Sequence, residues 1–385
     1  MVATDTHRLA LKRHRLPDSD VELTNVVIPA KAINELYRAL GVFEGDVLVD
    51  VAPNHVAFRC GSLRIITRLI DGRYPDYRQV IPKSYLTRLN ALDGSAFLRT
   101  IERAAVFAQD EVVTGPDGGS GFAEVFGRRL DAVDPAAVGR RAADKAVRSA
   151  SPRAIEPGEY EVVLEPNAVS TLVGFLAYIG FGGRALTEGR SCLSGKEGQR
   201  VADPRITIYD DALSPETIGL PFDFEGTPRR RVDLIRDGVF LDGVYDRRTA
   251  KQAGKETTGH ALPPPNPEGP FPLNLFMAPG DAGLEEMVAA TRRGLLVTRF
   301  HYSNIVNPVE SSITGMTRDG TWLIEDGEVR HPVVNLRFTQ SILEALSAVS
   351  MVGRDTELAS EFFFSASRVP ALKIDRFRFT SRSDH

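Results

Sequence analysis

A chain of 385 residues with 42% hydrophobic residues and a net charge of −4 has the composition of a folded globular protein of two or more domains. Its pI near 6.0 excludes the overall positive charge of a general nucleic-acid binder. Cys60 and Cys192 lie far apart and suit a reducing compartment better than a disulfide framework. Because no apolar run reaches the roughly 18 residues of a membrane span and no signal peptide opens the chain, we expect a cytoplasmic protein.

The first third of the sequence predicts one helix followed by an antiparallel meander. The helix begins at Pro29, carries Ile33, Leu36 and Leu40 on one face, and ends at Gly41. Apolar runs separated by turn residues then predict strands over residues 47–51, 56–60 and 63–66.

The pattern changes near residue 110. An amphipathic helix is expected from Ser95 to Gln109, and the glycine-rich run TGPDGGSGFAE that follows cannot continue it. We expect Asp110 to Ser120 to be weakly anchored and open to proteases, because the segment is polar and rich in glycine. The sequence therefore divides into three segments: residues 1–110, a seam at 111–130, and residues 131–385.

The segment after the seam predicts a strand-rich α+β domain. A helix opens with Asp134 as N-cap and Pro135 in the first turn. The strand YEVVLEP leads into NAVSTLVGFLAYIGFGG, a helix that is apolar around most of its circumference and should be buried. Asp237-Gly238 and Asp326-Gly327 each separate two apolar runs, which predicts two-residue hairpins.

Three motifs of the first segment, MVATDTHRLAL, VIPAKAINEL and RLIDGRYPDYRQVIP, resemble the bacterial DNA polymerase sliding clamp, the beta subunit of the replicative polymerase. The resemblance covers residues 1 to about 110, which correspond to the later part of the clamp's middle domain and the first helix of its third domain. It implies a shallow groove for peptide motifs of polymerases and repair factors, and a DNA-facing Lys31. By position, the groove residues are Thr4, His7, Arg8, Leu9, Pro75, Gln79 and Val80.

The rest of the clamp is absent from this sequence, including the strands that form the other wall of the groove. His7 and Arg8 therefore fit ordinary surface residues as well as they fit peptide-binding residues. We do not expect this fragment to close a ring around DNA, because a ring needs complete domains.

Motifs of the later sequence, among them EGRSCLSGKEGQRV, TGHALPPPNP and SSITGMTRDGTWLIEDGEVRHPVVNLRF, resemble the TldD/PmbA family of cytoplasmic proteins linked to peptide processing. The match runs from about Val112 to the end. Catalytic TldD-type members carry His-Glu-x-x-x-His on the helix after the VVL strand, where the histidines bind zinc and the glutamate is the base. Here those positions are Gly174, Phe175 and Ile179, and the family's late cysteine ligand is missing too, so we expect no metal and no catalytic residue.

The expected fold is thus a partial sliding-clamp domain followed by a TldD/PmbA-type β-rich α+β domain. The resemblance implies the PmbA side, also called TldE: the non-metallated subunit of a peptide-processing metallopeptidase complex, inactive alone and without a cofactor. Zinc would reside in a TldD-type partner, the substrate would be an unfolded peptide, and no membrane is involved. The alternative is a DNA replication processivity factor that binds clamp-interacting peptides.

Two origins are compatible with this sequence, a genuine fusion and a misjoined reading frame. Truncation inside two clamp domains favours the second, because it leaves unpaired strand edges and incomplete cores. Three single residues also have alternative interpretations. Cys192 has no histidine in its local sequence and is expected to be a buried structural thiol rather than a nucleophile. His260 and His301 could contact a substrate or a partner, but a structural role is the commoner case.

Overall fold

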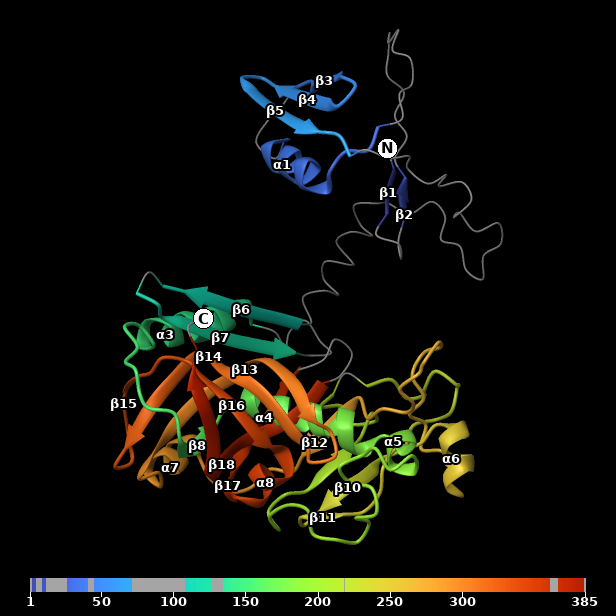
Figure 1. Cartoon of the computed structure of the whole chain (residues 1–385), viewed down its shortest axis with the longest axis vertical. Helices are drawn as coiled ribbons and strands as arrows, with labels where there is room; N and C mark the ends of the chain where they lie inside the picture. The colour runs from blue at the N-terminus through green and yellow to red at the C-terminus, as the bar shows by residue number, and fades with distance from the viewer. Residues whose placement is uncertain are drawn as a thin grey trace. The chain divides into compact units, whose positions relative to one another are not determined.

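The computed structural model describes the greater part of the chain (Figure 1). The described residues are 2–4, 9–11, 26–40, 45–70, 108–115, 117–126, 134–217, 219–360 and 366–383. The chain divides into two compact units, Met1–Leu92 and Asp93–His385. None of the helices within these described stretches has the length and apolar character of a membrane span.

The first unit contains two small antiparallel sheets and a helix. Its elements are β1 (Val2–Thr4), β2 (Leu9–Leu11), α1 (Ala30–Leu40), β3 (Leu48–Val51), β4 (His55–Cys60) and β5 (Leu63–Arg68). Strand β1 pairs with β2, and β3, β4 and β5 form a sheet in that order. Leu36 of α1 packs with Phe58 and Cys60 of β4, whereas Leu48 and Ile66 are exposed. The helix and the three strands predicted from the sequence are confirmed.

The second unit is larger and combines one extended sheet with several helices. Its strands are β6 (Ala108–Thr114), β7 (Ser120–Phe126), β8 (Glu159–Leu164), β9 (Ile208–Asp210), β10 (Val232–Arg236), β11 (Val239–Phe240), β12 (Asn274–Met277), β13 (Arg293–Asn307), β14 (Ser312–Glu325), β15 (Glu328–Pro332), β16 (Leu336–Ser341), β17 (Val349–Ala359) and β18 (Ala366–Arg382). Its helices are α3 (Pro135–Arg148), α4 (Pro166–Leu176), the π-helical turn η3 (Ala177–Phe181), α5 (Gly183–Thr187), α6 (Arg247–Ala253), α7 (Leu284–Ala289) and α8 (Ile342–Ser347).

The main sheet of the second unit closes on itself. Its strands follow the order β11-β10-β9-β12-β18-β16-β14-β13-β8, and β8 also pairs with β18. Strands β8, β13, β14, β16 and β18 therefore form a barrel, and the hairpin β6–β7 and α3 lie together at one side of it (Figure 1). Phe300, Phe338 and Phe377 pack together in the core, with ring centroids 4.4 to 5.5 Å apart.

Both Asp-Gly pairs form the predicted hairpin turns. Asp237 and Gly238 connect β10 to β11, and Asp326 and Gly327 connect β14 to β15. All four residues have φ between 50° and 77°, the left-handed conformation that a type I′ turn requires at both central positions. The capped start of α3 is also confirmed, since the Asp134 carboxylate accepts a hydrogen bond from the backbone N–H of Ala137.

The structure corrects the expectation for residues near 110. Ala108 and Gln109, expected at the end of a helix, begin strand β6, and the remainder of that predicted helix lies outside the described residues. The glycine-rich run belongs to the β6–β7 hairpin rather than to a loosely held segment. Gly121 lies so close to α3 that a Cβ atom there would overlap the carbonyl oxygen of Ala142. The glycines thus permit close packing, and the hairpin is part of the second unit.

Candidate functional site

Helix α4 and the turn η3 form the segment on which the family resemblance places a catalytic site. Every residue from Asn167 to Leu176 is buried, as the apolar sequence predicted. At Ala177 the helix widens into a π-helical turn that ends at Phe181. Such turns occur often at functional sites, and their hydrogen bonds join residues five positions apart.

The side chains at the expected ligand positions do not fit a zinc ion. Gly174 has no side chain, and Phe175 and Ile179 are 6% and 4% exposed and offer only carbon atoms. Zinc needs nitrogen, sulfur or oxygen ligands, and a general base needs a titratable group. These three positions therefore supply neither a zinc ligand nor a base. In the described part of the chain, no three His, Cys, Asp or Glu side chains are grouped so that they could hold a metal ion.

His260 is a fully buried histidine with partners at both ring nitrogens. Its Nε2 lies 3.0 Å from Oδ1 of Asp210, and its Nδ1 lies 2.9 Å from the carbonyl oxygen of Thr258. The other oxygen of Asp210 accepts a hydrogen bond of 2.8 Å from the backbone N–H of Asn274. Because His260 has no exposed surface, this network supports a structural role.

The surroundings of Cys192 support its structural interpretation, and those of His301 set the charge of its ring. The Cys192 side chain is 2% exposed and packs in the main core of the second unit. Burial raises the pKa of its thiol to about 11, so the thiol is uncharged near neutral pH and is a poor nucleophile. Partial burial, together with the charges of Arg318 and Arg299, lowers the pKa of His301, which favours the neutral imidazole.

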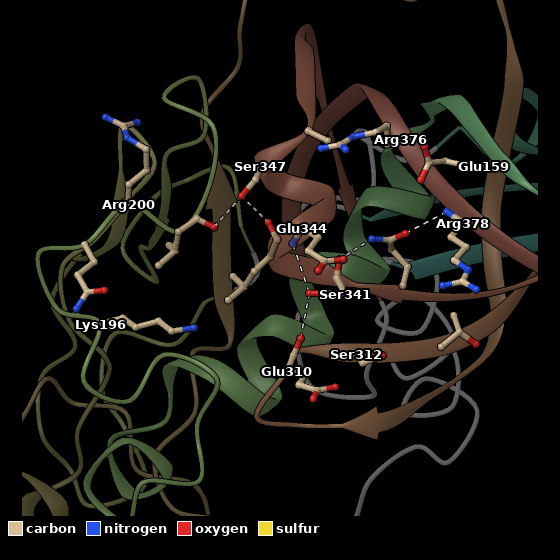
Figure 2. Close-up of a pocket in the computed structure, with 16 residues that line it drawn as sticks. Glu159, Lys196, Arg200, Glu310, Ser312, Ser341, Glu344, Ser347, Arg376 and Arg378 are labelled. Atoms are coloured by element: carbon tan, nitrogen blue, oxygen red, sulfur yellow. Dashed lines mark hydrogen bonds between the residues drawn. The ribbon is translucent and has the colours of Figure 1, made fainter.

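A groove of about 1000 Å³ opens in the second unit. Figure 2 shows Lys196 and Arg200 on the loop at one side and Arg376 and Arg378 on the other side. The latter two residues belong to β18. Ser341, at the end of β16, lies between the two sides (Figure 2).

Hydrogen bonds order the middle of this groove. The Ser341 hydroxyl donates to the carbonyl oxygen of Glu310 at 3.0 Å and accepts from the backbone N–H of Glu344, so that Ser341 is the N-cap of α8. The buried side chain of Gln340 donates to the carbonyl oxygen of Ser341 and accepts from the backbone N–H of Arg378 at 3.0 Å. The groove is therefore built on fixed backbone, with polar groups at its centre.

Sequence reasoning did not find this groove. Its lining comes from the start of β8, the loop before β9, the turn before β14, the end of β16, α8 and β18, which are far apart in the sequence. No local motif marks these residues. The only available signal was the set of charged residues in otherwise apolar strands, such as Arg376 and Arg378 beside Phe377.

The predicted clamp-like residues lie mostly beyond the described structure. Lys31 is exposed in the first turn of α1. Thr4 ends β1 and Leu9 begins β2, so the pairing of these strands brings the two residues opposite each other. The other groove positions, His7, Arg8, Pro75, Gln79 and Val80, are outside the described residues.

A protein-family comparison accounts for most of the second unit. Residues 157–381, more than half of the chain, match the model of the PmbA/TldA metallopeptidase C-terminal domain. This chain belongs to the PmbA/TldA metallopeptidase family. A metalloprotease of Methanothermobacter thermautotrophicus is 27% identical over 253 residues, which are 64% of this chain and 53% of that protein. The chain thus spans about half the length of this relative.

Solved structures share the fold of the PmbA/TldA unit. TldE from Thermococcus kodakarensis superposes with a TM-score of 0.62 at 24% identity, over 71% of this chain and 62% of that one. A protein of Thermotoga maritima titled as a modulator of DNA gyrase gives a TM-score of 0.63 at 23% identity, over 71% of this chain and 61% of that one. At these identities the likeness establishes the fold alone.

The beginning of the chain matches a different family. Residues 1–76 match the central domain of the DNA polymerase III beta subunit. The beta sliding clamp of Staphylococcus epidermidis is 38% identical over 108 residues, which are 28% of this chain and 28% of the clamp. The chain is therefore two-part, with a partial sliding-clamp-like region before the PmbA/TldA domain, as the sequence motifs predicted.

Proposed function

We propose that the second unit is the non-metallated, TldE/PmbA-like subunit of a cytoplasmic peptide-processing metallopeptidase complex. The observation that carries this proposal is the chemistry of Gly174, Phe175 and Ile179. The resemblance assigns these residues to the motif positions, and they supply no metal ligand and no base. Membership of the PmbA/TldA family supports it as well. The zinc ion and the base belong to a TldD-type partner, and this chain contributes its fold and its surfaces for the partner and for unfolded peptide.

Metal content and activity test this proposal directly. The purified full-length chain should hold well under one zinc ion per chain by elemental analysis and should not cleave an unfolded peptide alone. It should copurify with a TldD-type protein from its own cells, and that pair should cleave the peptide. A catalytic TldD-type protein prepared in the same way is the positive control. Stoichiometric zinc, or peptidase activity of this chain alone, would refute the proposal.

A second function is favoured by the match of the first region to the sliding clamp. In this proposal, residues of the first unit bind the short peptide motifs of polymerases and repair factors, without encircling DNA. The test is fluorescence anisotropy with a labelled clamp-binding peptide and the full chain. Binding that is lost in Leu9→Ala would support peptide recognition, and absence of binding at high micromolar protein would reject it. If the chain is retained on circular DNA and released after the circle is cut, it encircles DNA, which would contradict this proposal.

The origin of the two-part chain has its own test. We propose that portions of two unrelated families, with limits near residues 110 and 131, meet through a misjoined reading frame. Intact-mass measurement in the source cells should then find no full-length species. Detection of the complete chain would establish a genuine fusion.

A further inference from the structure

Four basic side chains converge on the groove of the second unit without a charged partner. They are Lys196, Arg200, Arg376 and Arg378. None of the four lies within ion-pair distance of an acidic side chain in the described part of the chain, and only Arg200 makes a side-chain hydrogen bond, to the carbonyl oxygen of Asp237 at 3.2 Å. Elsewhere in this unit, pairs between arginine and carboxylate are common. The groove therefore presents four basic side chains that form no direct ion pair within the described residues.

These charges flank the groove from two sides. Arg376 and Arg378 are two positions apart on β18, so their side chains leave the same face of the strand. Figure 2 shows Lys196 reaching toward the groove from the loop on the opposite side. Arg200 lies on the same loop at the rim, with its guanidinium on the carbonyl oxygen of Asp237. A ligand in the groove consequently has cations on both sides and could pair with them along its length.

The remaining lining limits what this ligand can be. Three acidic side chains, Glu159, Glu310 and Glu344, leave the basic groups in excess by one. Among the described residues, Val201 and Leu343 are the only large apolar side chains of the lining, and none of the lining side chains is aromatic. Hydrophobic anchoring is therefore minor, and the stacking that holds single-stranded nucleic acid is missing. Hydroxyl and amide groups between the two basic sides suit the backbone of a peptide.

We propose that this groove binds an extended, hydrophilic peptide rich in aspartate and glutamate. The inference rests on the proposed peptide-processing function and adds the substrate class and the place where it binds. Carboxylates of the peptide form charge-assisted hydrogen bonds with the lysine and the arginines. Because each exposed ion pair is weak and screened by salt, binding needs several acidic residues and falls as ionic strength rises.

The experiment is a titration of the full chain, without a partner, against fluorescein-labelled peptides. The probe is a ten-residue peptide of Glu, Ser and Gly, and the comparison peptide has Lys in place of Glu. We expect the acidic peptide to bind at least about tenfold more tightly, and Lys196→Ala/Arg200→Ala and Arg376→Ala/Arg378→Ala each to weaken it by about tenfold, the loss of roughly two exposed ion pairs.

The matched control is Lys251→Ala/Arg292→Ala. Both residues are exposed, both lie outside the groove and neither has an ion-pair partner among the described residues, so the change in net charge is the same. The dissociation constant of this variant for the acidic peptide should lie within about twofold of that of the parent chain, because only the long-range electrostatic attraction changes. An equal loss in the control would mean that overall charge and not the groove binds the peptide, and it would overturn the proposal.

Two further outcomes would also overturn it. One is absence of binding at low salt, and the other is tighter binding of single-stranded DNA of the same charge. The assay is independent of zinc and of peptidase activity. If the chain holds zinc and still binds the acidic peptide in the groove, only the proposed function is refuted. If the chain is free of zinc and does not bind the peptide, only the present inference is refuted.

Discussion

The two units differ in how completely they enclose a hydrophobic core. In the first unit, α1 covers one face of a three-stranded sheet, and Leu48 and Ile66 remain 57% and 56% exposed. In the second unit, a closed barrel buries Leu164 and Phe338 fully. Yet the first region has the higher identity to its relative, 38% against 27%. Identity therefore says little about whether a segment carries enough of the fold to be stable, which depends on the fraction of surface that it buries.

The sharpest test of this difference is Phe338→Ala. Phe338 is fully buried, with the rings of Phe300 and Phe377 at 4.4 and 5.4 Å between centroids. Removing a buried phenyl ring leaves a cavity and should lower the free energy of unfolding of the second unit by about 3–5 kcal/mol. Calorimetry should show a shift of this unit's transition alone. Phe224→Ala, at a site that is 49% exposed, is the matched control and should have little effect. Equal shifts of both transitions would contradict independent units.

Where local chemistry decided the structure, the sequence predicted it. Helix α1 has a complete apolar stripe, and the turns at Asp237 and Asp326 have the residue types that a type I′ turn requires. The burial of α4 followed from a surface that is apolar around most of its circumference. In each case the signal lies within one element or between two neighbouring strands.

Where distant segments decided the structure, sequence reasoning failed. Ala108 continues an apolar pattern of helical spacing, but Ala108 and Gln109 pair with Phe126 and Val125 of β7. Pairing across a hairpin overrides that weak helical preference. The groove is the stronger case. Arg378 lies beside Gln340 because β18 pairs with β8 on one side and with β16 on the other.

Thiol labelling compares the two units in the native protein. Cys60 and Cys192 are 4% and 2% exposed, so each thiol can react only after local or global unfolding exposes it. The smaller core of the first unit should open more easily, and Cys60 should react at least about a hundredfold faster, a difference of about 2.8 kcal/mol in opening free energy. Mass spectrometry of peptides after timed alkylation measures both rates. Similar rates would mean that the first unit is as stable as the second.

Glycine substitutions test whether the β6–β7 hairpin belongs to the second unit. In Gly121→Ala the new methyl group would overlap the carbonyl oxygen of Ala142, so we expect a loss of about 1–3 kcal/mol from overpacking. Gly139→Ala on α3 has no atom within 4 Å of the new methyl group and should stabilise the unit by about 0.5–1 kcal/mol. Chemical denaturation followed by near-UV circular dichroism measures both. A neutral Gly121→Ala would restore the interpretation of this stretch as a loose linker.

A smaller effect than that of Gly121→Ala is expected at a buried polar atom in the barrel wall. Thr298 is fully buried, and its hydroxyl has no hydrogen-bond partner in the described part of the chain. The hydroxyl lies beside Gly320, which has a φ of +120°. Gly320 and Asp319 lie where the register between β13 and β14 shifts. Thr298→Val keeps the shape and removes the unsatisfied hydroxyl, so the free energy of unfolding should rise by about 1 kcal/mol.

Gly320→Ala at the same place should have the opposite sign, because its methyl group would overlap the ring of Trp322 and its backbone angle is unfavourable for alanine. Urea denaturation of the two variants and the parent gives both signs in one series. Loss of stability in Thr298→Val would show that the hydroxyl is satisfied, for example by a buried water. The irregular pairing of β13 and β14 would then be a hydrated feature of the barrel, and the difference between the two units would include internal water as well as core size.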